Sequence, residues 1–458
     1  DQRPNGCKGP EDPARYIRRL MTGLLLALAY ASLFLYAIRK VPFFSAPGLP
    51  RRWIGAFLLL KIVAGTALWY VYTYVHTDRA TADIYRFFDD GNIMFRALPE
   101  HPLDYLRMIT GIGNDQKRFD VNYYQVMNNW YRQYEGNLYN DAHTMIRFNA
   151  FVRLFSFGHY HVHTVFICFF CTIGLVALYR AFAPLLPGHE RAWSLTLFVL
   201  PSVLFWTSGV LKEALLIFVL GLFLLAVLEL LRGRKRTWLL VLPPTIALLF
   251  FLKFYVLLSL VPAMGAYAWC ARTGARQPLL KSGIAFTTFL VLGLNSDLFY
   301  PNFRMLEVLY VKQRDFIGMA TAAHSDSFVD VTPLEPNLRS FISQAPHALY
   351  MTFLSPLTAW RTGVLGTLSA VENLWLLILP LLAFRWRRPQ AQVDKPLLFF
   401  CLGFCILLAL VIGWTTPVIG AIVRYRVPLL PFLIMACLCI ADPARVPWPS
   451  WMRIPSDQ

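Results

Sequence analysis

The sequence predicts an all-α fold, a polytopic transmembrane helical bundle of about 11 spans with two large extracytoplasmic loops. Of the 458 residues, 57% are hydrophobic and only 15% are charged, whereas soluble domains carry about 25% charged residues. Long apolar stretches recur along the whole chain, so residues 1–458 are expected to form a single polytopic membrane domain. This composition excludes a disordered chain, a collagen-like chain and an ordinary soluble enzyme.

The predicted spans are stretches that are apolar and long enough, or nearly so, to cross a hydrocarbon core about 30 Å thick. In chain order they are 20–38, 53–75, 161–183, 192–208, 211–231, 237–252, 254–271, 282–296, 367–385, 396–415 and 427–441. Prolines fall where several of these helices would bend, at Pro201, Pro243, Pro244 and Pro262. The regions 192–231 and 237–271 are therefore each also consistent with a broken or re-entrant pair.

The net charge of +17 is distributed unevenly along the chain. Four short connections, at 39–52, 232–236, 272–281 and 385–395, hold 15 Lys or Arg and one acid. The long connections 76–160 and 297–366 hold 14 Lys or Arg and 16 Asp or Glu. Because Lys and Arg collect in short cytoplasmic loops, the short connections are expected inside and the long ones outside.

This distribution makes the basic run at 232–236 a cytoplasmic anchor, in contact with membrane lipids, and no nucleic-acid partner is expected. One conflict remains at the N-terminus. Arg15, Arg18 and Arg19 precede a first span whose start the alternation places outside, so the orientation of that span stays open.

Candidate site residues occur first in the loop 76–160, where apolar residues at helical spacing after Asp83 predict an amphipathic helix at the membrane interface. Asp83 and Asp90 are seven residues apart and share a face of that helix, while Asp89 lies to the side. Such carboxylates can deprotonate a hydroxyl acceptor or coordinate a divalent cation, Mg²⁺ or Mn²⁺. The alternative is a solvated acidic helix face. Asp141, late in the loop, is expected to lie away from the site.

Ionisable residues beside long apolar runs provide further candidates. Lys212 and Glu213 begin one predicted span, and Lys253 ends another. Charges at such depth usually face the protein interior or a water cavity, although a mutual ion pair or snorkelling at a span end would also account for them. Lys61 and Glu372 are weaker candidates of the same kind.

Arg424 and Arg426 form the third group, on the side of the membrane where basic residues are less common. Two guanidinium groups at a lipid surface suit a phosphate or diphosphate, because the planar fork of donors matches phosphate oxygens. Contact with lipid headgroups without catalysis is the alternative.

Together, these features resemble the GT-C superfamily of integral-membrane glycosyltransferases, which includes dolichyl-phosphate-mannose-dependent mannosyltransferases and lipid A aminoarabinose transferase. Three segments carry the resemblance, namely 77–92, 205–213 and 424–428, within a layout of many spans and a large acidic outer loop. The resemblance implies a bacterial inner-membrane enzyme and a sugar donor linked to a polyprenyl phosphate. It also implies a glycan, lipid or protein acceptor.

The resemblance further implies that Asp83, Asp89 or Asp90 is the catalytic base or holds a metal. By the same resemblance, the leaving phosphate would be neutralised by Lys212, Arg424 and Arg426. The family places its acidic loop after the first span, whereas here the loop follows the second, so the resemblance does not fix which aspartate acts. Other function classes remain open: a non-catalytic scaffold subunit of an envelope complex, a polysaccharide polymerase, or a transporter.

Overall fold

A computed structural model of the chain describes residues 13–75, 77–131, 140–234, 236–322, 325, 327–447 and 449. Helices account for all the regular secondary structure of these residues, apart from three isolated β-bridges. In the first half of the chain they are α1 (Pro13–Lys40), α2 (Arg51–Tyr70), α3 (Asp83–Glu100), α4 (Pro102–Thr110), α5 (Lys117–Asn122), α6 (Ala142–Ser156), α7 (Tyr160–Phe182), α8 (Glu190–Phe198), α9 (Pro201–Trp206) and α10 (Lys212–Leu231). In the second half they are α11 (Leu242–Thr273), α12 (Pro278–Leu294), α13 (Met305–Ala322), α14 (Leu338–Phe353), α15 (Val364–Arg385), α16 (Lys395–Thr415), α17 (Ile419–Tyr425) and α18 (Leu430–Ile440).

Seven of the described helical segments are long and apolar enough to cross a membrane. They are Leu20–Lys40, Arg51–Val75, Tyr160–Leu185, Lys212–Leu231, Arg236–Thr273, Val364–Arg385 and Lys395–Thr415. The pair α17 and α18 passes the same test only as one unit, with a bend of 61°, which would make eight. The all-α membrane fold is therefore confirmed, with fewer candidate spans than the expected 11.

The difference has local physical causes. The stretch 192–208 divides into α8 and α9, because Pro201 starts a new helix and each piece is too short to span. The two spans expected at 237–252 and 254–271 are the two halves of α11, which meet at a kink where Lys253 has non-helical dihedral angles (φ −155°, ψ 78°); together they count as one candidate span, Arg236–Thr273. Pro243 and Pro244 lie in its first turn, where proline is tolerated. The stretch 282–296 gives α12, a shorter apolar helix.

The centre of the bundle consists of α7, α10, α11, α16 and α18, whose apolar side chains form one continuous core. Glycines allow α7 and α10 to approach closely. A Cβ atom added at Gly221 would lie 2.1 Å from the carbonyl oxygen of Gly174, and one added at Gly174 would lie 2.3 Å from that of Ile217. Such small residues at crossings are the usual means of close helix packing in membranes.

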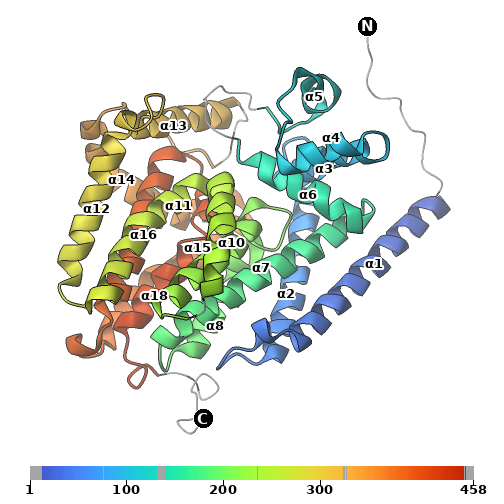
Figure 1. Ribbon diagram of the computed structural model, residues 1–458. Coiled ribbons are helices and arrows are strands. Elements are labelled where there is room, and N and C mark those ends of the chain that lie inside the picture. Colours follow the sequence, from blue (N-terminus) through green and yellow to red (C-terminus); the bar gives the residue numbers. More distant parts are fainter. Residues whose placement is uncertain are drawn as a thin grey trace.

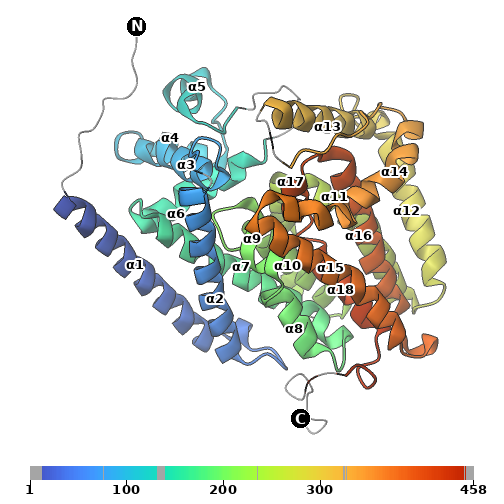
Figure 2. The same cartoon turned by 180° about the vertical axis from the view of Figure 1, so that it is seen from behind.

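Helices α3 to α6 and helix α13 lie at one end of the bundle, and the turn between α1 and α2 lies at the other (Figure 1 and Figure 2). The amphipathic helix expected after Asp83 is α3, which buries Ile84, Phe87 and Met94 and packs against α6. The beginning of α3 therefore lies close to the ends of the spanning helices.

Candidate functional site

Arg424 lies between two carboxylates that come from distant parts of the chain. Its Nη1 donates a 2.8 Å hydrogen bond to Oδ2 of Asp83, the first residue of α3. Its Nε lies 3.0 Å from Oε2 of Glu213, in the first turn of α10. The Glu213 side chain is only 1% exposed, and neither of its oxygens accepts a hydrogen bond from the part of the chain that the structure describes. Arg424 and Glu213 thus form a close, buried ion pair that is not aligned as a hydrogen bond.

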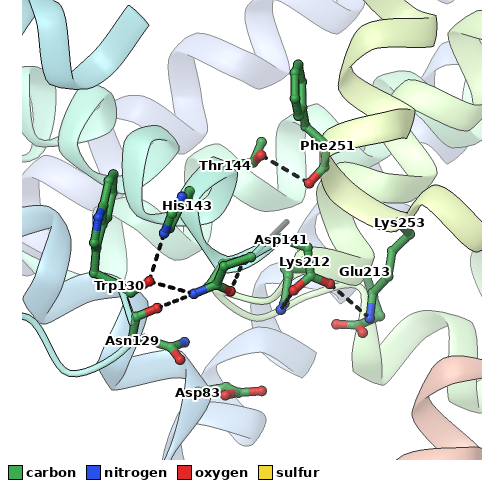
Figure 3. A network of polar contacts seen from close by, with 12 residues as sticks. Asp83, Asn129, Trp130, Asp141, His143, Thr144, Lys212, Glu213, Phe251 and Lys253 are labelled. Atoms are coloured by element: carbon green, nitrogen blue, oxygen red, sulfur yellow. Dashed lines mark hydrogen bonds and ion pairs between the residues drawn. The ribbon is translucent and has the colours of Figure 1, made fainter. Parts of the chain in front are cut away.

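Asp141 lies beside this pair and contacts two lysines, as Figure 3 shows. Lys212 Nζ donates a 2.9 Å hydrogen bond to its Oδ1, and Lys253 Nζ lies 3.8 Å from its Oδ2. Lys253 is buried at the break in α11, where the helix is interrupted. We use the name ionic cluster for Asp83, Asp141, Lys212, Glu213, Lys253 and Arg424. Three of its members carry negative charge and three carry positive charge, so it is neutral when all are ionised.

Aromatic rings cover the cations of the cluster. Lys253 Nζ lies 4.1 Å from the ring centre of Tyr425 and 5.5 Å from that of Tyr255, and Lys212 Nζ lies 5.3 Å from that of Phe87. Such contacts stabilise a partly desolvated cation. They also leave little water around the lysines, so charges within the cluster interact strongly.

The charge state of Asp83 follows from its neighbours. Burial raises the pKa of this carboxyl, but Arg424 and Lys212 outweigh burial, so its pKa lies below the ordinary value. The Asp83 side chain keeps 31% of its surface exposed, more than Asp141, Lys212 or Glu213. Asp83 is thus an ionised carboxylate that reaches solvent at the edge of the cluster.

The other two aspartates of α3 point elsewhere. Asp89 forms an exposed pair with Arg79, whose Nη2 lies 2.7 Å from Oδ1. Asp90 is fully buried and accepts hydrogen bonds of 2.8 Å from the backbone N–H groups of Asn128 and Asn129. Burial raises its pKa to about 6, against the opposing effect of those two hydrogen bonds. Asp90 therefore holds the 128–129 segment against α3, and neither residue contacts Arg424 or Lys212.

Arg426 is also buried, but it belongs to a second polar group. Its Nη1 donates to Asn373 Oδ1 and lies 3.5 Å from the carbonyl oxygen of Thr352. Glu372 accepts a 3.1 Å hydrogen bond from the backbone N–H of Ser202 and a further one from the Ser202 hydroxyl. Lys61, fully buried, donates a 2.6 Å hydrogen bond to Thr207 Oγ1. Among the described residues, these three candidates form no ion pair with the ionic cluster.

Asp141 is the member that sequence reasoning missed, and the expectation that it lies away from the site was wrong. It precedes α6, and the packing of α6 against α3 and α11 brings it to Lys212 and Lys253. Tyr72, at the end of the α2 span, is a further missed neighbour, within electrostatic range of Arg424, Asp83 and Glu213. Only its place at a span end, where tyrosine is common, could have indicated it.

The expected Mg²⁺ or Mn²⁺ stays a prediction, and the carboxylates of the cluster have cationic neighbours. Asp83, Asp141 and Glu213 each face an Arg or Lys side chain that already neutralises them. Among the described residues, no group of three or more His, Cys, Asp or Glu side chains is arranged to hold a metal. Each carboxylate of the cluster thus already has a cationic side chain as its counterion.

No protein family, curated protein or solved structure matches the chain. The function is therefore argued from the ionic cluster and its surroundings.

Proposed function

We propose that the protein is an integral-membrane glycosyltransferase that moves a sugar from a polyprenyl-phosphate-linked donor to a glycan, lipid or protein acceptor. We place it in a bacterial cytoplasmic membrane, with the α3–α6 end outside. The observation that carries the proposal is the position of Arg424 between Asp83 and Glu213, beside two lysines that share Asp141. Buried ionisable groups of this kind in a membrane bundle are usually functional.

The donor phosphate would bind by exchange, because the cluster is already neutral. Phosphate oxygens would take the place of Asp83 on Arg424 and of Asp141 on Lys212 and Lys253. Arginine suits this task, since its fork of donors matches phosphate geometry. Asp83 is the carboxylate best able to leave, because its side chain is the most exposed of the cluster carboxylates (31%).

The same exchange would activate Asp83 as a base. Arg424 lowers the pKa of Asp83 in the unliganded protein, and burial raises it. Once phosphate occupies Arg424, the pKa of Asp83 rises and the carboxylate accepts a proton more readily. Binding of the donor would thus prepare the base that the reaction needs.

The proposed reaction is a displacement at the anomeric carbon. The acceptor hydroxyl oxygen forms a bond to that carbon, and its proton passes to Asp83. The bond between the anomeric carbon and the phosphate oxygen breaks, and its electron pair leaves with the phosphate. Lys212, Lys253 and Arg424 stabilise the charge that develops on the leaving group. Glu213 is a positioning residue, because it orients Arg424 from the buried side.

A transporter is the second candidate, and one observation favours it. Helix α11 is interrupted at Lys253, within the cluster, and α17 and α18 meet at a bend of 61° just after Arg424. Transporters commonly bind substrates where spanning helices are broken. Uptake of a labelled anionic solute into proteoliposomes, lost in Arg424→Ala, would support this reading over the transferase.

Purified protein in nanodiscs, supplied with a panel of polyprenyl-phosphate sugars and envelope acceptors, tests the proposal. We expect transfer from at least one donor and its loss in Arg424→Ala. The matched control is Arg79→Ala, which removes an exposed arginine paired with Asp89. Equal activity of Arg424→Ala and the wild type would refute the site. Absence of transfer from every donor would favour a non-catalytic subunit of an envelope complex or another of the remaining classes.

A further inference from the structure

A cavity of about 750 Å³ lies between the α4–α6 segment and the spanning helices α7, α10 and α11. The six residues of the ionic cluster, all of them described, do not line it. Yet Thr144, Leu215 and Leu252 do, and each is within three residues of a cluster member. The cavity is thus a second compartment, lined in part by α6, which Asp141 directly precedes, and by α10 and α11, which carry Glu213 and Lys253.

The cavity has two chemically different walls. The spanning helices supply an apolar wall that includes Phe170, Phe218 and Leu248. The α4–α6 segment supplies a polar, aromatic wall that includes Asp120, where Tyr131 donates a 2.5 Å hydrogen bond to the carboxylate. Leu248 keeps 38% of its surface exposed, so this apolar wall is accessible rather than enclosed by protein.

Charge restricts the headgroup that could occupy the polar wall. Asp115 and Asp120 both line it, and they would repel an anionic group. Arg147, the arginine among the described lining residues, offsets one of these two charges; it donates a 2.9 Å hydrogen bond to the Met108 carbonyl and lies 5.7 Å from the Trp130 ring centre. Carboxylates instead accept hydrogen bonds from hydroxyl groups, and phenol groups both donate hydrogen bonds to them and accept hydrogen bonds from them. The volume lies within the range of ordinary ligand pockets.

We propose that this cavity binds an uncharged glycolipid, with its apolar chain against α7, α10 and α11 and its hydroxyl-rich headgroup under the α4–α6 segment. The phosphate-bearing lipid would go to the cations of the ionic cluster, and the uncharged lipid to the acidic cavity. The further assignment of this glycolipid as the acceptor rests on the proposed transferase function, whereas the binding itself does not.

Photolabelling of the full chain in phosphatidylcholine nanodiscs tests the binding. The probe is dodecyl maltoside with a diazirine in its alkyl chain, which has an uncharged, hydroxylated headgroup. We expect labels on peptides from α7, α10 and α11. We also expect unlabelled dodecyl maltoside to compete at a concentration at least tenfold lower than dodecyl phosphate. Labels confined to other helices, or equal competition by the two lipids, would overturn the proposal.

Two variants with a matched control locate the site. Leu248→Trp fills the cavity from a partly exposed position, and Leu290→Trp on α12 is the control, since Leu290 is 44% exposed and does not line the cavity. We expect at least fivefold less labelling in Leu248→Trp and none lost in Leu290→Trp. Asp120→Asn should weaken competition by dodecyl maltoside and strengthen competition by dodecyl phosphate, because it removes one of the two carboxylates that repel an anion. Unchanged labelling in Leu248→Trp would contradict the assignment.

The labelling and transfer measurements together also separate this proposal from the transferase proposal. The double variant Arg424→Ala with Glu213→Gln, which has no uncompensated buried carboxylate, should keep full labelling while it loses transfer, because the cavity includes neither residue. Loss of labelling in this double variant, at a temperature where it is folded, would show that the two compartments are one, against our proposal. Specific labelling without transfer from any donor would retain the glycolipid site and count against the transferase.

Discussion

Arg424 Nη1 and Asp83 Oδ2 are joined by a 2.8 Å hydrogen bond across 341 positions of the sequence. The bond connects the start of α3 with α17 and so brings the α3–α6 segment to the spanning helices. Glu213 contacts the same guanidinium from the buried side. Arg424 therefore helps to keep the exposed Asp83 ionised and also neutralises the buried charge of Glu213.

Substitutions of Asp83 and of its neighbour Asp89 should affect the rate of transfer differently. If Asp83 is the base, Asp83→Asn lowers kcat/KM for transfer by about 10²–10⁴-fold. Asp89→Asn should stay within about twofold of wild type, since Asp89 contacts exposed Arg79. The measurement is initial-rate transfer at matched protein levels. A larger loss in Asp89→Asn than in Asp83→Asn would reverse the assignment.

Removal of Arg424 should cost stability through Glu213. Arg424→Ala leaves a buried carboxylate without its counterion, which typically costs about 3–5 kcal/mol. Adding Glu213→Gln to that variant removes the uncompensated charge, so the double variant should unfold at a higher temperature than Arg424→Ala alone. Thermal unfolding followed by tryptophan fluorescence measures both. Simple additivity of the two losses would show that the residues do not interact.

Asp141→Asn should make stability dependent on an anionic lipid. Without Asp141, Lys212 and Lys253 lose their shared carboxylate and repel each other in a poorly solvated site. We expect the unfolding temperature to fall by several degrees and a polyprenyl phosphate to restore it, because ligand binding to the folded state stabilises it. Asp104→Asn is the control, since Asp104 pairs with Arg118 away from the cluster. Equal rescue of both variants would speak against phosphate binding at these lysines.

Asp90 should give the protein a stability that falls as pH rises. Burial raises its pKa from 3.8 to about 6, so the folded state binds the proton more tightly than the unfolded state. The contribution is therefore complete below about pH 4 and is lost as pH rises through about 6. Unfolding temperatures between pH 4 and pH 7 should fall in the wild type and in Asp89→Asn, and should change less in Asp90→Asn. An equal slope in Asp90→Asn would assign the effect to another group.

Sequence patterns predicted the helical membrane fold because hydropathy alone determines which stretches can span. They also indicated the bend at Pro201 and the break between 237–252 and 254–271, where Lys253 is non-helical. They overestimated the number of spans, because hydropathy does not show how packing divides an apolar stretch into helices too short to span. Among the predicted site residues, Asp83, Lys212, Glu213, Lys253 and Arg424 lie together. Asp90 shares a helix face with Asp83 by spacing. Its carboxylate, however, accepts hydrogen bonds from the backbone N–H groups of residues 128 and 129, which the sequence does not indicate. Asp141 escaped notice because no local pattern shows which lysine a loop aspartate will meet.

The crossing of α7 and α10 has a consequence for the distant ionic cluster. Gly221 lies eight residues after Glu213 on α10, or about 12 Å along the helix axis. A side chain at Gly221 would collide with the Gly174 backbone, so α10 would have to tilt or shift. A tilt of about 5° about that point displaces Glu213 by about 1 Å, which is large beside its 3.0 Å separation from Arg424 Nε. The close approach that Gly174 and Gly221 permit therefore helps to set the position of Glu213 beside Arg424.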